Sequence, residues 1–472
     1  MRDIEPQLTF ADLEFMSHGV RMNPVLQQIS DLLDKNKELV ETVRQQLNRG
    51  LKKPNTGRNG LTAEQVLRSL ILMRVKDWDY RELSERIADG YTLRQFTHFQ
   101  ASRVPKHDAF NRGHNRLSAS TVQAVNDLVI RFAVKAGLED GSKLRVDTMV
   151  VETNIHWPTD ATLLWDSIRV LIRLTRRLRQ ISPNGAPRIV NRKRAARKLM
   201  QKLQRMTATQ RQTQQLPAYR ELLAIAQQVL ENALLVVKAI ESVPGQTLAN
   251  VRAIETLRTE ITNHCQLGER AVHQARRRVI DGEQVPSSDK IYSIFEPHTA
   301  LIKRGKTNKP IEFGHKVFLA ESGSGLITEY RVLDGNPHDE GHVQGSLRRH
   351  RQVFAAAPKL YAGDRNFQSE TNETACKDAG VANVCTPQRG GKKTADRQAR
   401  EQSLEFKKGQ AFRAGIEGTI SVLMRGRGMR RCLTHGKERF ELLVAAAVLA
   451  NNLMRIAQLL LNTKKKSRSI AA

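Results

Sequence analysis

The sequence predicts a mixed α/β domain that is preceded by an all-α domain and interrupted by a long, basic, all-α segment. Three observations predict this fold class. Residues 61–135 carry short helical patterns, each opened by a helix-start signal. Alternating apolar and polar residues, which are typical of strands, occur at 143–155 and again from Ile311 onwards. Between these two β-rich stretches, residues 166–284 have helical periodicity throughout.

These patterns divide the 472 residues into five segments. Such a length is sufficient for about three domains of ordinary size. The segments are a polar lead (1–60), an all-α domain (61–135), an α/β domain built from two pieces (140–165 and 290–462), a basic all-α insertion (166–289) and a basic tail (463–472).

The all-α domain is predicted from repeated helix-capping signals. Each consists of Thr, Ser or Asp followed three residues later by Gln or Glu, which is the spacing of a capping box or its aspartate variant. The four signals are Thr62-x-x-Gln65, Asp79-x-x-Glu82, Thr92-x-x-Gln95 and Ser120-x-x-Gln123. Their close spacing predicts short helices, as in a helix-turn-helix bundle. Two interpretations stay open: a domain for DNA contact or dimerisation, and an ordinary helical domain.

The α/β domain begins with a strand, since Leu144, Val146 and Val150 alternate with more polar positions. A hairpin follows, in which residues 315–320 and 326–333 flank the turn 321–325. Next come a helix at 343–354, a strand ending at Asp364, a helix at 373–377 and a strand at 381–385. Further helices include the one that carries Glu417, and a last amphipathic helix ends near Leu461.

The charge of the chain predicts a polyanionic partner. The formal net charge is +29 and the isoelectric point is about 10.4. Binding to DNA or RNA is favoured for such a chain because it releases the counterions of the nucleic acid. Only 5% of the residues are aromatic, so base stacking is not expected to be the main binding device. The alternative is a basic protein whose charge only keeps it soluble.

The insertion carries the most one-sided charge. Residues 166–211 contain 14 Lys or Arg and a single acidic residue, Asp166. A solvated helical face usually has both signs of charge, so this excess favours contact with phosphates. The candidate residues are Arg192, Lys193, Arg194, Arg197 and Lys198. A solvated basic face remains the alternative.

Cysteine content and apolar runs bear on the compartment. The four cysteines form no Cys-x-x-Cys pair and have no zinc-module spacing, which indicates a reducing compartment. The longest apolar run, residues 442–450, is too short to span a bilayer, and residues 1–6 lack an apolar signal region. We therefore expect a cytoplasmic, nucleoid-associated protein without a membrane partner.

Three carboxylates lie where metal-assisted chemistry on a phosphodiester would need them. Asp147 lies on a predicted strand, Asp364 at the end of another, and Glu417 on a predicted helix. Acidic side chains can hold two Mg²⁺ ions about 3.5–4 Å apart, which together activate the nucleophile and stabilise the leaving oxygen. Each acid also has an ordinary interpretation: a surface ion pair for Asp147, a helix or turn cap for Asp364, and pairing with Arg413 for Glu417.

Two further features concern these sites. Gly415 and Gly418 flank Glu417, and glycine costs about 1 kcal/mol relative to alanine in a helix, so we expect a close neighbour there. A rival metal site is His338-Asp-Glu-Gly-His342, which places two histidines four residues apart. It departs from the zinc-protease pattern, because position 339 is aspartate and Gly341 favours a loop.

Taken together, five stretches resemble a bacterial insertion-sequence transposase of the DDE type. The similarity covers nearly the whole chain beyond the first fifty residues. The stretches are Val146–Asp160, Phe295–Thr299, Glu312–Val317, Gly363–Phe367 and Arg413–Gly418. The resemblance implies a ribonuclease-H-like catalytic domain in which Asp147, Asp364 and Glu417 hold two Mg²⁺ ions, with Mn²⁺ as a substitute. It also implies cleavage at inverted-repeat ends and attack of the freed 3′-hydroxyl on target DNA.

The implied partners are double-stranded DNA, both element ends and target, and further copies of the chain in a homodimer or higher synaptic oligomer. Basic residues near the proposed acids are expected to contact this DNA, namely Lys316, Arg413, Arg425 and Arg427. In the tyrosine–arginine–glutamate–lysine signature of related transposases, Gln410 replaces the tyrosine and Met424 the lysine, with Arg425 next to it.

The position of the insertion also departs from better-known members, whose insertion lies later in the chain. We expect it to clamp DNA or to form a dimer contact. Two other functions remain open at this point: a non-catalytic DNA-binding protein derived from a transposase, and a cellular DNA nuclease of the same fold.

Overall fold

The computed structural model describes residues 9–52, 56, 60–182, 190–240, 248–303 and 310–471. These residues form two compact units. The first unit contains Met1–Glu152 and His315–Ala472, and the second contains Thr153–Gly314. The predicted all-α domain and most of the predicted α/β domain thus share one unit, whereas the insertion forms the other and has wider bounds than 166–289.

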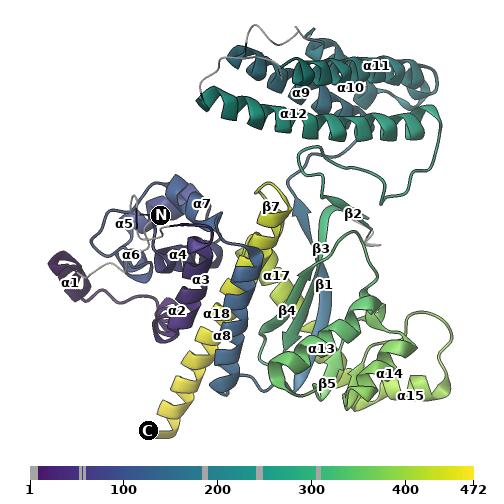
Figure 1. Ribbon diagram of the computed structural model, residues 1–472. Coiled ribbons are helices and arrows are strands. Elements are labelled where there is room, and N and C mark those ends of the chain that lie inside the picture. Colours follow the sequence, from purple (N-terminus) through teal and green to yellow (C-terminus); the bar gives the residue numbers. More distant parts are fainter. Residues whose placement is uncertain are drawn as a thin grey trace. The chain divides into compact units, whose positions relative to one another are not determined.

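A mixed sheet organises the first unit (Figure 1). Its strands are β1 (Lys143–Thr153), β3 (Ile311–Ser322), β4 (Ile327–Val332), β5 (Leu360–Ala362), β6 (Asn383–Cys385) and β7 (Arg431–Cys432). The strand order is β3-β1-β5-β6, with β4 on the other side of β3 and β7 paired to β1. Strands β3 and β4 are antiparallel around the turn at 321–325, so the predicted hairpin is confirmed. Strands β1, β5 and β6 are parallel.

Helices cover both faces of this sheet because successive strand residues point to opposite sides. Leu144 and Val146 pack against α13 (Val343–Phe354) and α14 (Glu370–Asp378). Met149 and Val151 belong instead to the core that contains α17 (Ile416–Gly426) and α18 (Lys437–Ala471). Short helices η2 (Asp339–His342) and η3 (Arg365–Phe367) precede α13 and α14, and α15 (Ala395–Gln402) and α16 (Leu404–Ala414) follow β6.

The remaining helices of the first unit share this larger core. They are α1 (Phe10–Ser17), α2 (Pro24–Lys35), α3 (Lys37–Asn48), α4 (Ala63–Lys76), α5 (Tyr80–Asp89), α6 (Tyr91–Phe96), α7 (His107–His114) and α8 (Ala119–Lys135). Helix α18 packs along α8, α4 and α2. The predicted polar lead therefore contains core helices, since Ile29 and Leu33 of α2 and Val43 of α3 are buried. Helix α18 also continues past Leu461, through the segment expected to be a basic tail.

Two of the four predicted capping signals are confirmed. Thr62 and Gln65 form the capping box of α4, and Asp79 caps α5. The other two are wrong. Helix α6 begins at Tyr91, before Thr92, and α8 is capped by Ser118, whose side chain accepts a hydrogen bond from the Thr121 backbone N–H.

Most of the second unit is helical. Its helices are α9 (Asp160–Ile181), α10 (Lys193–Arg205), α11 (Ala208–Ile240), α12 (Leu248–Ala275) and the π-helix η1 (Arg276–Ile280). Asp160 joins the start of α9 to the end of this bundle, because it accepts hydrogen bonds from Gln274 at 2.9 Å and Arg278 at 2.7 Å. Strand β2 (Ala300–Lys303) pairs with residues 311–314. Most of the predicted break at 182–187 lies outside the described residues.

Two of the described helices, α11 and α18, are long and apolar enough to cross a membrane by length and composition alone. Each packs an apolar face into the core of its own unit, and 72% of the most apolar window of α18 is buried. Core packing accounts for their apolar composition.

Candidate active site

Asp147 and Asp364 lie near each other. Parallel strands β1 and β5 pair Arg145 with Ala362, the last residue of β5. Asp147 lies two residues beyond that pair on β1, and Asp364 lies two residues beyond it in the turn that follows β5. The proximity has an electrostatic consequence, since the negative charge of Asp364 helps to raise the pKa of Asp147.

Asp147 is a buried carboxylate with a raised pKa. Its relative exposure is 9%. Burial is the largest cause that raises its pKa, to about 6, and the nearby carboxylates of Asp364 and Asp339 add to this effect. The ion pair with Arg413 and a hydrogen bond from the Thr148 backbone N–H, at 2.7 Å, act in the opposite direction.

Arg413 connects Asp147 to Glu417. Its Nη2 donates to Asp147 Oδ2 at 2.6 Å, and its Nη1 donates to Glu417 Oε1 at 3.1 Å. The expected local pairing of Arg413 with Glu417 is therefore present, but the same guanidinium also binds an acid 266 residues away. Glu417 lies in the first turn of α17 with an exposed side chain. Arg413 thus links two of the predicted acids, Asp147 and Glu417, whereas among the described residues the three predicted acids do not form a cluster of metal-ligand type.

Gly415 allows the guanidinium of Arg145 to approach the backbone closely, which is the close neighbour expected beside Glu417. A Cβ atom at Gly415 would overlap the guanidinium of Arg145. That guanidinium is fixed by hydrogen bonds to Glu321 at 2.6 Å and to the Phe412 carbonyl oxygen at 2.7 Å, and it lies over the Phe412 ring. Gly418, by contrast, has no heavy atom within 4 Å of the position of an added Cβ.

Hydrogen bonds from Gln410 and within the turn itself fix the turn that carries Asp364. Gln410 Nε2 donates to the carbonyl oxygens of Gly363 at 3.2 Å and Cys385 at 2.6 Å. Asp364 also caps η3, because its Oδ1 accepts a hydrogen bond from the Asn366 backbone N–H at 2.8 Å. The capping role anticipated as the ordinary interpretation of Asp364 is thus present, at the same position that faces Asp147.

A fourth carboxylate near the site, Asp339, is considered in the sequence only as part of the rival zinc motif. Asp339 is buried, and its Oδ1 accepts hydrogen bonds from Lys316 Nζ at 3.0 Å and Thr148 Oγ1 at 3.2 Å. Thr148 follows Asp147 directly in the sequence, but nothing local connects either residue with position 339.

Asp339 belongs to the motif considered as a zinc site. Within the described part of the chain, the motif contributes to no cluster of metal-ligand type. The His342 ring lies against Phe318 instead. The one such cluster among the described residues is Asp34, Glu64 and His98, where the buried guanidinium of Arg68 pairs with both acids. That ion pairing accounts for the cluster.

The predicted DNA-contacting residues have different surroundings. Arg425 is exposed, as are Arg192, Arg194, Arg197 and Lys198 at the start of α10. Lys193 is half-buried, and Lys316 is engaged with Asp339 and the Pro337 carbonyl oxygen. Arg427 is buried and donates to the Val75 carbonyl oxygen, so it joins α17 to α4 and is not presented to DNA.

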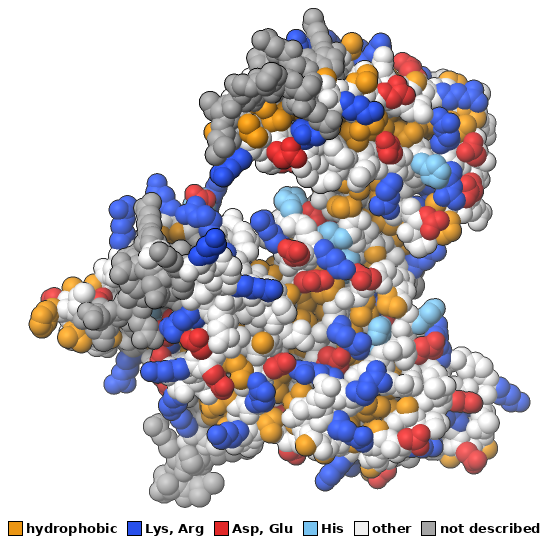
Figure 2. Space-filling model, in the orientation of Figure 1, with side chains coloured by type: hydrophobic (Ala, Val, Ile, Leu, Met, Phe, Trp, Pro, Cys, Tyr) orange, Lys and Arg blue, Asp and Glu red, His pale blue; other side chains and the backbone are white. Residues whose placement is uncertain are grey.

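The distribution of surface charge agrees with the composition. On the face drawn in Figure 2, Lys and Arg side chains lie over both units and are interspersed with acidic ones. In α10 the charges follow helical periodicity: Ala196, Met200 and Leu203 face the core of the second unit, and the basic residues lie on the other side. The cations of α10 are thus available to a phosphate backbone.

Two family models match the chain. The model described as a transposase DDE domain matches residues 361–457, which include Asp364 and Glu417. The model described as a transposase domain (DUF772) matches residues 16–116, from α1 to just past α7. No curated protein and no solved structure matches. The match to a DDE domain that includes Asp364 and Glu417, and the match to a second transposase domain before it, together support an insertion-sequence transposase of the DDE type.

Proposed function

We propose that this transposase cleaves the ends of its element and joins them to target DNA, using Asp147, Asp364 and Glu417 as its catalytic carboxylates. The observation that supports the proposal is the proximity of these acids. The charge of Asp364 acts on Asp147, and the Arg413 guanidinium pairs with both Asp147 and Glu417.

The order of elements supports a ribonuclease-H-like catalytic domain. Strand β1 carries the first acid, the β3–β4 hairpin and α13 follow, β5 ends just before the second acid, and α17 carries the third. This order agrees with the one that the family resemblance implies. The long insertion between β1 and β3 forms a separate unit and leaves the order of the catalytic elements unchanged.

The acids suit Mg²⁺, with Mn²⁺ as a substitute, because carboxylate oxygens are the ligands that such hard cations prefer. Asp147 is buried close to Asp364 and Asp339, an accumulation of negative charge that a cation would relieve. The chemistry that two such ions supply, when bound, is activation of the attacking oxygen and stabilisation of the leaving oxygen. In the structure, Arg413 supplies the compensating positive charge between Asp147 and Glu417.

DNA is the proposed substrate in both steps. The net charge of +29 and the exposed cations of α10 and Arg425 support binding to phosphates. We further propose a homodimer or higher synaptic oligomer, since two element ends must be held together, and a cytoplasmic, nucleoid-associated location. We leave Arg427 out of the DNA surface because it is buried.

A nicking and joining assay tests this function. The probe is a supercoiled plasmid carrying the DNA that flanks the reading frame, incubated with Mg²⁺. Asp147→Asn, Asp364→Asn and Glu417→Gln should each abolish nicking and joining, whereas Asp378→Asn, at the exposed end of α14, should retain both. If any of the three variants at Asp147, Asp364 and Glu417 retains strand transfer, the proposed catalytic triad is refuted. Binding without nicking in the wild type would identify a non-catalytic DNA-binding protein, and cutting without joining a nuclease.

A further inference from the structure

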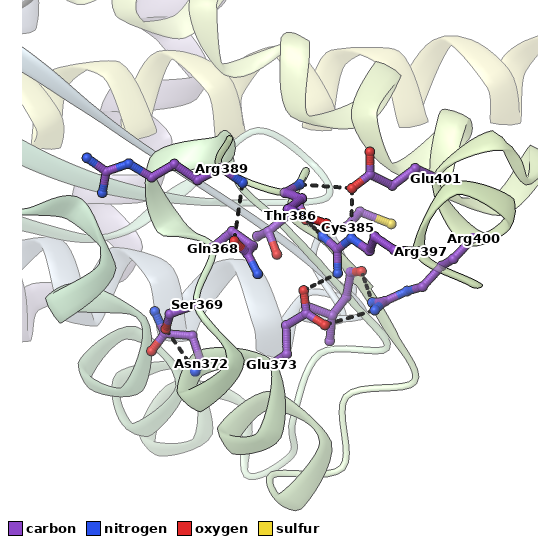
Figure 3. A network of polar contacts seen from close by, with 12 residues as sticks. Gln368, Ser369, Asn372, Glu373, Cys385, Thr386, Arg389, Arg397, Arg400 and Glu401 are labelled. Atoms are coloured by element: carbon purple, nitrogen blue, oxygen red, sulfur yellow. Dashed lines mark hydrogen bonds and ion pairs between the residues drawn. The ribbon is translucent and has the colours of Figure 1, made fainter. Parts of the chain in front are cut away.

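The segment that follows β6 is held to the first unit by charges and hydrogen bonds. It runs from Thr386 to Ser403 and includes α15, none of whose residues is buried. Apolar packing therefore contributes little to its position. Figure 3 shows the polar network that fixes it.

Two arginines of α15 bind the end of β6. Arg397 donates to the Thr386 carbonyl oxygen at 2.5 Å, and Arg400 donates to the Val384 carbonyl oxygen at 2.6 Å. Both arginines also pair with Glu373 of α14, Arg400 at 2.9 Å. Because these charged groups are mostly buried, the base of the segment is firmly positioned (Figure 3).

Glu401 then closes a short loop, residues 388–393, which we call the Glu401 loop. The Glu401 carboxylate accepts hydrogen bonds from the Gln388 backbone N–H at 2.8 Å and from Lys393 Nζ at 2.5 Å, so it holds both ends of the loop. Burial opposes its ionisation, but the hydrogen bonds from Lys393, Gln388 and Arg397 lower its pKa to about 2. A second anchor joins the Arg389 backbone N–H to Gln368 Oε1 at 3.2 Å.

The tip of the Glu401 loop is exposed and cationic. Gly390 and Gly391 have φ values of 68° and 71°, a left-handed conformation that glycine adopts without strain. On either side of them, Arg389 and Lys392 are exposed. In Figure 3 the Arg389 side chain extends away from the network that holds its backbone. The acids of the network are already paired with Arg397, Arg400 and Lys393, and Arg389 has only a long 3.8 Å pair with the exposed Glu340.

The loop leaves the sheet at the edge where Asp364 lies. Parallel strands β5 and β6 pair Ala362 with Cys385, so the segments that follow both strands start at the same edge. Gln410 binds the carbonyl oxygens of Gly363 and Cys385 and thereby connects the two segments directly. The exposed cations of the Glu401 loop and the proposed catalytic acid Asp364 therefore lie at the same edge of the sheet.

We propose that the Glu401 loop binds the phosphate backbone of the DNA strand beside the phosphate that reacts at Asp364, through Arg389 and Lys392. The proposal rests on the proposed function, because it takes Asp364 as the place of reaction. The ion-pair network fixes the base of the loop. Gly390 and Gly391 give the tip of the loop the conformation in which it contacts the DNA strand.

The first experiment measures binding by fluorescence anisotropy with a mixed-sequence duplex, in EDTA, over a range of salt concentrations. Arg389→Gln/Lys392→Gln should weaken binding about tenfold or more and reduce the slope of log Kd against log salt by about 1.8, which corresponds to two phosphate contacts. The control Lys359→Gln/Lys377→Gln removes the same charge at the opposite, amino-terminal edge of β5 and β6 and should keep the wild-type slope. An unchanged slope in Arg389→Gln/Lys392→Gln would overturn the proposal.

The second experiment locates the contact. An iron–EDTA reagent is attached to Lys392→Cys or, as control, to Lys377→Cys; the four native cysteines are buried. On a duplex with the DNA that flanks the reading frame, Lys392→Cys should cut within a few nucleotides of the nicking position and Lys377→Cys should not. Cuts from both, or from neither, would refute this placement. If Asp364→Asn still nicks while the Lys392→Cys cuts stay in place, the proposed triad fails and the loop contact stands.

Discussion

Asp147 lies on β1 two residues beyond the Arg145–Ala362 pair, and Asp364 lies two residues beyond the same pair in the turn that follows β5. The pairing of β1 with β5, together with the turn held by Gln410, therefore brings the two acids near each other although they are far apart in the sequence. Burial and the nearby carboxylates raise the pKa of Asp147 even though Arg413 pairs with it, as expected for a site shaped by function and not by stability.

The first prediction concerns the stability of Asp147→Asn. The folded-state pKa of Asp147 is about 6, above its ordinary value of 3.8, so the wild type loses stability as the pH rises from about 4 to about 6. The asparagine does not titrate. The variant's free energy of unfolding, relative to wild type, should therefore increase by about 2–3 kcal/mol between about pH 4 and pH 7. Chemical denaturation at both pH values measures this. A difference that does not change with pH would show that burial of the charge is not costly.

The second prediction concerns Arg413→Gln. Removing the guanidinium leaves Asp147 and Glu417 without their shared cation. The variant should be less stable without metal and should gain more thermal stability from Mg²⁺ than the wild type, because the carboxylates are then free for the ion. Thermal unfolding with and without Mg²⁺ provides the comparison, with Arg425→Gln as the control. Equal Mg²⁺-induced shifts in wild type and Arg413→Gln would argue against competition at this site.

The third prediction uses the two glycines beside Glu417. Gly415→Ala should destabilise the protein by about 1–3 kcal/mol, because the new Cβ displaces Arg145 from Glu321, whose side chain is buried. Gly418→Ala meets open space and should stabilise by up to about 1 kcal/mol through helix propensity. Equilibrium unfolding of the two variants checks the contrast. Equal effects would mean that contact with Arg145 is not what requires glycine at position 415.

The fourth prediction concerns α10 in the second unit. Arg194→Gln/Arg197→Gln/Lys198→Gln should lower DNA affinity and reduce the magnitude of the salt slope by up to about 2.7, one contact per side chain. The control removes three exposed cations from α11 and α12, as Arg220→Gln/Lys238→Gln/Arg252→Gln. Anisotropy titrations at several salt concentrations give both slopes. If the α10 triple variant matches the wild type, α10 lies outside the DNA interface.

Local patterns in the sequence predicted local structure well. The hairpin around 321–325, the helix at 343–354 and the strand that precedes Asp364 are confirmed. Each is encoded by neighbouring residues: alternation in strands, and periodicity in the helix. The failed capping signal at Ser120 has a local cause, because Ser118, two residues earlier, already binds the Thr121 backbone N–H.

Contacts between distant residues could not be predicted in this way. The sequence suggested Arg413 as a DNA contact, with an ion pair to Glu417 as the ordinary alternative, whereas its pairing with Asp147 depends on the contact of α16 with β1. Likewise, the ion pair of Arg145 with Glu321 spans 176 residues, and Asp339 approaches the site from a different segment. The Glu401 loop has an ordinary composition, and its position at the sheet edge that also carries Asp364 follows only from the β5–β6 register.

The most direct test of the central claim is metal binding to the protein–DNA complex, measured with Mn²⁺ by electron paramagnetic resonance. If the three acids form one site, Asp147→Asn, Asp364→Asn and Glu417→Gln should each lower the amount of tightly bound Mn²⁺, while Asp378→Asn should bind as much as the wild type. Unchanged Mn²⁺ binding in any one of the three would contradict a shared metal site.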